Sequence, residues 1–187
     1  MNTYLEFEKP IEQLDNKVHE LKSLNDNAPS DNLLEEITQV EEQINETYRK
    51  IYSSISPWQR TLVARHPQRP KTREYIQNLI EDFFPLSGDR FFSEDKAILG
   101  GFGKFRGKTV LVLGHEKGHD TTSRIEHNFG MPRPEGYRKA QRLMKLAEDF
   151  DIPVISFVDT PGAYPGVGAE QRGQSEAIAK TTECCLS

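Results

Sequence analysis

A glycine- and proline-rich segment constrains the fold more than any other part of this 187-residue chain. It runs from Asp159 to Glu170 and contains three glycines and two prolines. The apolar run 152–158 before it predicts a strand, and the run from Glu170 to about Lys180 predicts a helix. Such strand-to-helix junctions gather backbone N–H groups that hold an anion or a carbonyl oxygen. The segment therefore predicts a binding turn, with an ordinary connecting turn as the alternative.

The residues upstream predict two strands and a helix. The runs 98–105 and 109–114 form a β-hairpin in which Gly107 supplies the turn. Residues 72–83 predict a helix, with Thr72 as its amino-terminal cap. Residues 64–70 are expected to be extended or irregular, because proline disfavours helix at the residue before it.

A second helix and a further strand complete the predicted domain at 57–187. The helix begins near Pro134, and residues 153–158 form a continuous apolar strand of the kind buried on both faces. Together these elements predict a parallel α/β layer. The inner face of the helix is expected to consist of Tyr137, Ala140, Leu143, Met144, Ala147 and Phe150.

The amino-terminal part, residues 1–56, predicts a helical hairpin arm. Apolar residues recur at three- and four-residue steps on both sides of a turn at 25–31. The stripe needs a partner surface, which is either the other helix of the hairpin or another subunit. Its members are Ile11, Leu14, Val18, Leu21, Leu33, Ile37, Val40, Ile44, Tyr48, Ile51 and Ile55.

Composition and net charge argue against several classes of function. The net charge of −5 without a basic block argues against binding to nucleic acid. No apolar segment has the length of a membrane span and no secretory signal is evident, so a cytoplasmic protein is expected. The adjacent Cys184 and Cys185 cannot form a zinc site alone. His115 and His119 are expected in a polar loop, and His127 at the surface, so no metal is expected.

Side-chain nucleophiles are scarce. No Gly-x-Ser-x-Gly motif and no Cys/His pairing is present. The segment 101–109 approaches a phosphate-binding loop, but its glycines enclose five residues instead of four and a strand follows, which argues against a GTPase. We therefore expect backbone dipoles to stabilise an enolate or oxyanion.

Several longer segments carry a family resemblance. The chain resembles the α subunit of the bacterial and plastid acetyl-CoA carboxylase carboxyltransferase, from the arm to about Ala179. The matching segments are Ala64–Pro70, Gly88–Arg90, Asp95–Ile98, Gly114–Gly118, Asn128–Pro132, Pro134–Ala140 and Asp159–Ala179.

The resemblance implies a crotonase-like fold, in which ββα units form a superhelix. It also implies carboxyl transfer from carboxybiotin, carried on a biotin carboxyl carrier protein, to acetyl-CoA, which gives malonyl-CoA for fatty-acid synthesis. The implied partners are a carboxyltransferase β subunit in an α2β2 assembly, the carrier protein and an ATP-dependent biotin carboxylase. The β subunit, not this chain, is expected to hold a zinc ribbon. A crotonase-type decarboxylase fits the arm and Ala64–Pro70 less well.

The resemblance also assigns residues. Tyr164 is expected to pack on the biotin ring or to be structural. Arg172 and Glu170 are expected to position the turn or to cap the next helix, and Gly136 and Tyr137 to pack. No catalytic side chain is assigned. The residues expected to line the biotin end of the pocket are Thr160, Pro161, Gly162, Ala163, Tyr164, Pro165 and Gly166.

The chain departs from the family after Ala179. The family carries a second glycine cluster whose N–H groups form an oxyanion hole, and this sequence does not contain it. An incomplete superhelix with exposed inner strands, inactive by itself, is therefore expected. The alternative is a non-catalytic assembly or regulatory fragment that binds the β subunit through the helical arm.

Overall fold

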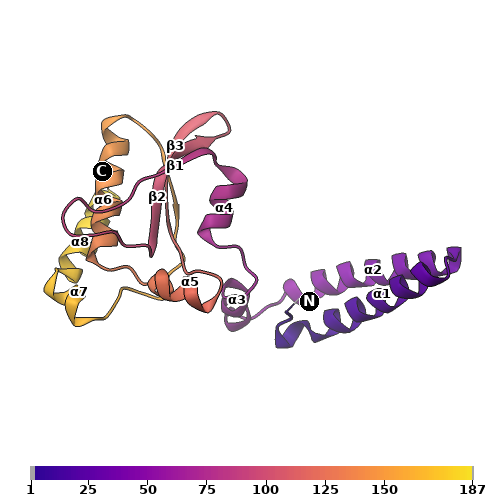
Figure 1. The fold of residues 1–187 in the computed structure, drawn as a ribbon. Coiled ribbons are helices and arrows are strands. Elements are labelled where there is room, and N and C mark those ends of the chain that lie inside the picture. The colour runs from indigo at the N-terminus through magenta and orange to yellow at the C-terminus, as the bar shows by residue number, and fades with distance from the viewer. Residues whose placement is uncertain (1–2, 187) are drawn as a thin grey trace. The chain divides into compact units, whose positions relative to one another are not determined.

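The computed structural model describes residues 3–186 and divides the chain into two units, Met1–Arg69 and Pro70–Ser187 (Figure 1). The division falls later than the boundary expected between residues 56 and 57, because a further helix belongs to the first unit. The helices of this unit are η1 (Glu6–Glu8), α1 (Lys9–Asn27), α2 (Asp31–Tyr52) and α3 (Pro57–Ala64).

The predicted intramolecular hairpin is present in α1 and α2. Its buried core consists of Val18 and Leu21 from α1 with Ile37 and Val40 from α2, as the apolar stripe predicted. Helix α3 was not predicted. It begins after Ser56, whose hydroxyl accepts a hydrogen bond from the Gln59 N–H at 3.2 Å, which is an N-cap arrangement.

The second unit contains a four-stranded sheet in the order β1-β2-β3-β4. The first three strands are antiparallel, whereas β4 pairs with β3 in parallel. The hairpin prediction is confirmed: Arg106 and Gly107 both have positive φ, as its two-residue turn requires. The strands are β1 (Glu81–Pro85), β2 (Ile98–Phe105), β3 (Lys108–His115) and β4 (Val154–Phe157).

Helices cover both faces of this sheet (Figure 1). Alternate residues of β3 point to opposite sides, so Leu111 and Leu113 join a core cluster with α6, while Val110 and Val112 join a second cluster with α4. The helices of the unit are α4 (Thr72–Leu79), α5 (Thr121–Glu126), η2 (Asn128–Gly130), α6 (Pro134–Asp149), α7 (Val167–Gln171) and α8 (Gln174–Cys184).

The helix predicted over 72–83 is wrong at its carboxyl end and at its cap. Helix α4 ends at Leu79, and the next residues form β1 because Pro85 and Phe84 pair with β2. Lys71, not Thr72, is the N-cap residue. The Thr72 hydroxyl instead donates to the His115 carbonyl at the end of β3, which ties α4 to the sheet.

Helix α6 is confirmed with one exception on its inner face. Ala140, Leu143 and Ala147 are buried against β2 and β3. Phe150 was expected there but is 68% exposed. The helix ends at Asp149, and Phe150 follows it as the C-cap residue with non-helical dihedral angles.

Strand β4 and the helix after it differ from expectation. The strand was predicted to be buried on both faces, but it lies at the edge of the sheet and Val154 is 44% exposed. The single helix predicted over 170–180 is two helices, because Gly173 adopts φ +80° between α7 and α8.

Candidate functional site

The glycine-rich turn lies between β4 and α7, at the carboxyl end of the parallel strand pair. Thr160 is a polar residue of this turn, and its side chain forms hydrogen bonds with the backbone of the turn and of η2. The Thr160 hydroxyl lies 2.6 Å from the Gly130 carbonyl oxygen and 2.9 Å from that of Gly162, and it accepts the Gly162 N–H at 3.0 Å. Gly162 has φ +145°, which favours glycine. Thr160 thus shapes the turn and fastens it to η2.

An ion pair fixes the start of the same turn. Asp159 pairs with Lys117, which follows β3. The Lys117 side chain also lies against Gly130, where an added Cβ would stand 3.5 Å from Lys117 Cε. The ends of β3, β4 and η2 are therefore joined by two polar contacts, one from Asp159 and one from Thr160.

Tyr164 is held through its backbone and covered on its ring. Its N–H donates to the Pro132 carbonyl at 3.0 Å, and the Gln174 side-chain amide donates to both carbonyls, of Pro132 at 2.9 Å and of Tyr164 at 3.2 Å. The Arg133 guanidinium lies 4.9 Å from the centre of the ring, within the range of a cation–π contact. Gly166 leaves room for the ring, since a Cβ there would stand 2.7 Å from its Cζ atom.

The side-chain carbonyl oxygen of Gln174 has no hydrogen-bond partner among the described residues. Gln174 is buried, and its Oε1 atom accepts no hydrogen bond within residues 3–186. Both donors of the amide serve the turn and the start of α6. Gln174 therefore stabilises the backbone at Tyr164, while its Oε1 atom has no hydrogen-bond donor among the described residues.

Glu135 connects the first turn of α6 to the α7–α8 junction. Its side chain is 1% exposed, and the carboxylate forms ion pairs with Arg172 and Arg138. Arg172 was one of the residues expected to position the turn. Arg138 donates in addition to Asp89 at 2.9 Å and to the Arg172 carbonyl at 3.1 Å. Glu170, the other residue expected in this role, is exposed.

Asp95 fixes the same end of α6 from another side. Its carboxylate accepts the N–H groups of Ala97 at 3.0 Å and Arg133 at 2.7 Å. Burial raises its pKa, although these donors and Lys139 oppose the rise. Gly136 packs directly on the carboxylate, as its expected packing role requires, because an added Cβ would lie 3.1 Å from Asp95 Cγ.

The histidines occupy different environments. His115 stands at the end of β3, where burial lowers its pKa; the nearby Lys117 also lowers it, whereas the Phe157 carbonyl and Asp159 oppose the shift. Its Nδ1 atom is buried with no hydrogen-bond partner among the described residues. His119 is exposed and lies 3.8 Å from Glu74. His127 was expected at the surface but is buried, and its Nδ1 atom lies 2.7 Å from the Ser123 carbonyl oxygen.

Sequence reasoning located the turn, whose seven expected residues, Thr160 to Gly166, are consecutive in the chain. It missed the roles of Lys117, Arg133, Glu135 and Gln174. The only local signal among these was Glu135, since an acidic residue suits the first turn of a helix. Within residues 3–186, no group of three or more His, Cys, Asp or Glu side chains is placed to hold a metal ion.

Comparison with known proteins identifies the family. The model of the family described as "Acetyl co-enzyme A carboxylase carboxyltransferase-like" matches residues 4–187. The chain belongs to this family. Curated relatives named acetyl-coenzyme A carboxylase carboxyl transferase subunit alpha are 56% identical in Paramagnetospirillum magneticum (98% of this chain, 57% of the relative) and 57% identical in Rhodopseudomonas palustris strain BisA53 (100% and 58%). The chain therefore spans less than three fifths of the relatives' length.

Similarity to a solved structure supports the crotonase-like α/β fold of this carboxyltransferase-family chain. The transcarboxylase 12S structure, described as a hexamer with hydrolysed methylmalonyl-coenzyme A bound, matches with a TM-score of 0.50 at 19% identity. The match covers 64% of this chain and 21% of the other. In this chain β2, β3 and α6 form one ββα unit, and β4 pairs in parallel with β3.

Among residues 3–186, none of the helices combines the length and the apolar character needed to cross a bilayer.

Proposed function

We propose that this chain contributes the biotin side of a carboxyltransferase that moves a carboxyl group from carboxybiotin to acetyl-CoA and so forms malonyl-CoA. The observation that carries the proposal is the family match across residues 4–187, which includes the whole turn from Thr160 to Gly166. The supporting geometry is a rigid glycine turn at the end of a parallel strand, a place where α/β proteins bind ligands.

The polar side chains of the turn suit a supporting role. Thr160 and Asp159 are engaged in contacts with Gly130 and Lys117. The chemistry is then left to main-chain dipoles, which can stabilise a developing oxyanion. Carboxybiotin supplies the carboxyl group; in our proposal Pro161, Gly162, Ala163, Pro165 and Gly166 shape the surface that meets it.

Tyr164 is proposed to form a wall of that surface. Its ring already has Arg133 on it and Gly166 beside it. This arrangement holds the ring in one orientation without a ligand. Biotin is therefore expected to meet a preformed aromatic wall, and its binding need not order the side chain.

The remaining components follow from the family. We propose a cytoplasmic assembly with a carboxyltransferase β subunit, served by a biotin carboxyl carrier protein and an ATP-dependent biotin carboxylase. Acetyl-CoA and the zinc ribbon are assigned to the β subunit. The second candidate function, assembly without catalysis through the arm, is favoured by one observation: α1 and α2 form a unit with its own apolar core.

The test mixes the chain with a β subunit and measures complex formation and malonyl-CoA-dependent carboxylation of free biotin, beside a full-length α control. A complex is expected. Turnover by that complex would support carboxyl transfer, whereas a complex without turnover would favour the second candidate, assembly without catalysis. Absence of any complex would overturn the proposed function.

A second experiment addresses the turn itself. Biotin binding to the complex is compared between the unchanged chain, Tyr164→Ala and the exposed control Phe150→Ala. We expect Tyr164→Ala to weaken binding and Phe150→Ala to leave it unchanged. Equal binding by all three would remove Tyr164 from the proposed pocket.

A further inference from the structure

The first unit separates its charges along the chain. Residues 1–46 contain twelve Asp and Glu but only three Lys, whereas residues 47–69 contain five Arg and Lys and no acidic residue. The acidic part covers α1 and most of α2, and the basic part covers the end of α2, α3 and the segment after it. The basic residues are Arg49, Lys50, Arg60, Arg65 and Arg69.

Most of these charges are not compensated within the chain. All five basic side chains are exposed, and none of them forms an ion pair or a side-chain hydrogen bond among the described residues. In contrast, two lysines of the hairpin pair across it, Lys17 with Glu36 and Lys22 with Glu41, both at 2.8 Å. The exposed acidic residues of α1 and α2 that lack such a pair among residues 3–186 are Glu20, Asp26, Asp31, Glu35, Glu42 and Glu46.

The basic segment, defined by Arg60, Arg65 and Arg69, follows the base of the hairpin. Residues within it are bonded to the start of the chain: His66 Nε2 lies 2.7 Å from the Thr3 carbonyl oxygen, and the Thr3 N–H donates to the Gln68 side chain at 2.9 Å.

The acidic tip, defined by Glu20, Asp26, Asp31 and Glu35, lies where α1 ends and α2 begins. Helix α2 has 22 residues and therefore separates the tip from the base of the hairpin by about 33 Å. Charges at this distance are screened, since the Debye length at physiological ionic strength is about 8 Å. The acidic tip therefore does not neutralise the basic segment of the same copy.

Each of the two charged regions also exposes a large apolar side chain. Trp58 on α3 is 66% exposed, and Leu24 near the acidic tip is 57% exposed. Leu24 lines a surface hollow on α1 together with His19, Glu20 and Ser23. Each region thus combines apolar surface with unpaired charge of one sign.

We propose that two copies of this chain associate through antiparallel arms, with the acidic tip of each copy on the basic segment of the other. The arrangement has two-fold symmetry, so the same contact forms twice. A parallel arrangement of the arms places acidic residues beside acidic residues and is disfavoured.

Charge alone does not hold such a dimer, because each exposed ion pair contributes little. The apolar centre of each contact is Trp58 of one copy in the hollow beside Leu24 of the other. Tryptophan and arginine are the residue types that carry much of the binding energy at protein interfaces, and the basic segment supplies both.

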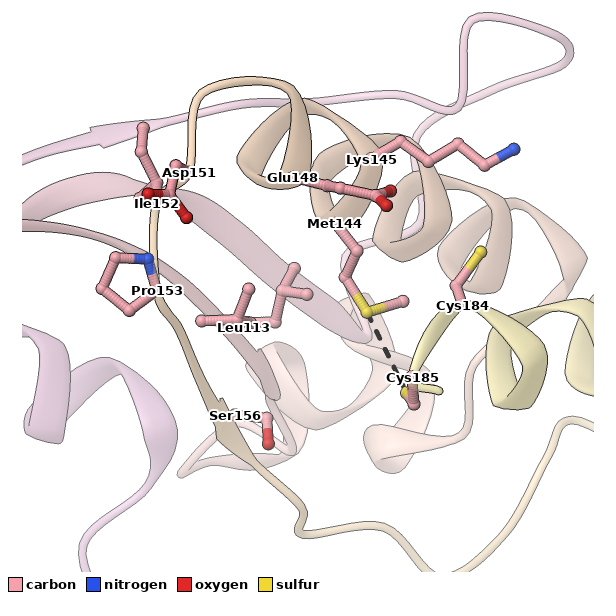
Figure 2. Close-up of a pocket in the computed structure, with 11 residues that line it drawn as sticks. Leu113, Met144, Lys145, Glu148, Asp151, Ile152, Pro153, Ser156, Cys184 and Cys185 are labelled. Atoms are coloured by element: carbon pink, nitrogen blue, oxygen red, sulfur yellow. Dashed lines mark hydrogen bonds between the residues drawn. The ribbon is translucent and has the colours of Figure 1, made fainter. Parts of the chain in front are cut away.

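The edge of the sheet is a second surface available for contact between copies. A cavity of about 530 Å³ beside β4 is lined by apolar side chains that include Leu113, Met144, Ile152 and Pro153 (Figure 2). Apolar contact at this edge does not weaken as salt is added, whereas pairing between exposed charges does. The salt dependence of association therefore distinguishes the two surfaces.

The test measures the mass of the full chain by sedimentation velocity, without any β subunit. We expect a dimer in about 50 mM NaCl, with a dissociation constant that rises more than about tenfold in about 500 mM NaCl. The combined variant Arg60→Glu, Arg65→Glu and Arg69→Glu is expected to weaken the dimer more than about tenfold at the lower salt. The matched control makes the same change of charge at three exposed positions of the second unit and is expected to dimerise as the unchanged chain does: Arg106→Glu, Lys108→Glu and Arg124→Glu.

A reversal of the tip completes the test. The combined variant Glu20→Lys, Asp26→Lys and Glu35→Lys is expected to be monomeric alone, and circular dichroism checks that its arm remains helical. Mixed with the reversed basic segment, it is expected to form a heterodimer, because opposite charges then meet again at both contacts. A monomeric unchanged chain, a dimer that salt does not weaken, a control as weak as the basic-segment variant, or a mixture that stays monomeric would each overturn the proposal.

Discussion

Replacing Gly166 with alanine tests whether Tyr164 is held in a tight aromatic wall. A Cβ atom at Gly166 would stand 2.7 Å from Cζ and 2.9 Å from the hydroxyl oxygen of Tyr164, and closer still to Cε1. Gly166 has φ −86°, a value that alanine adopts without strain. The ring of Tyr164 is therefore the main obstacle to this substitution.

The expected cost follows from three contributions. Forcing an extra carbon into a packed site costs about 1–3 kcal/mol. If the ring moves away instead, it gives up the Arg133 contact, worth about 0.5–1 kcal/mol at an exposed site. Alanine also lowers the conformational entropy of the unfolded chain, which offsets about 0.4–1 kcal/mol of this cost. We expect Gly166→Ala to lower the free energy of unfolding by about 0.5–2 kcal/mol.

A double-mutant cycle isolates the ring. In a Tyr164→Ala background the obstacle is gone, so Gly166→Ala should be neutral or stabilise the chain by up to about 1 kcal/mol. Gly162→Ala is the matched control: its φ is +145° and nothing lies within 4 Å of an added Cβ, so its cost should not depend on Tyr164. Urea unfolding followed by circular dichroism measures each variant. An equal cost of Gly166→Ala in both backgrounds would refute the reasoning.

Further predictions concern the core, the hairpin and pH. Leu143→Ala, at a fully buried position, should lower the unfolding free energy by about 2–5 kcal/mol in urea, and the exposed Phe150→Ala by no more than about 0.5. Gly107→Ala places alanine at φ +75° without a steric contact, so urea unfolding should show a loss of about 1 kcal/mol. Because His115 has a lowered pKa in the folded state, the unfolded chain binds its proton first as pH falls, and stability should drop below about pH 6.5. His115→Gln should flatten that slope when unfolding is measured from pH 7 to 5.

Local signals predicted much of the second unit. The β2–β3 hairpin depends on a two-residue turn that Gly107 favours, and α6 depends on a regular apolar face. The region after Thr72 could not be read in this way, because Ile80 and Phe83 suit a helix and a strand equally well. Pairing of Pro85 with Gly101 decides for the strand, and that partner lies far along the chain.

The candidate site shows the same limit. The turn itself was found from its composition, yet its supports come from residues about thirty positions earlier, such as Gly130 and Pro132. Glu135 and Arg172 each suit a solvent-exposed helix end when considered alone. Their pairing depends on how α6 meets the α7–α8 junction, which only the folded chain determines.

The supports of the turn explain why so few catalytic side chains were evident in the sequence. The Thr160 hydroxyl is committed to Gly130 and Gly162, and Asp159 is committed to Lys117. A group already engaged in this way is poorly placed to transfer a proton to a substrate, but it fixes the direction of nearby peptide dipoles. Stabilisation of an oxyanion requires that direction to be set before the charge develops. The polar residues of the turn therefore contribute to the proposed chemistry through the position of the backbone, and substitutions among them should act by altering its geometry.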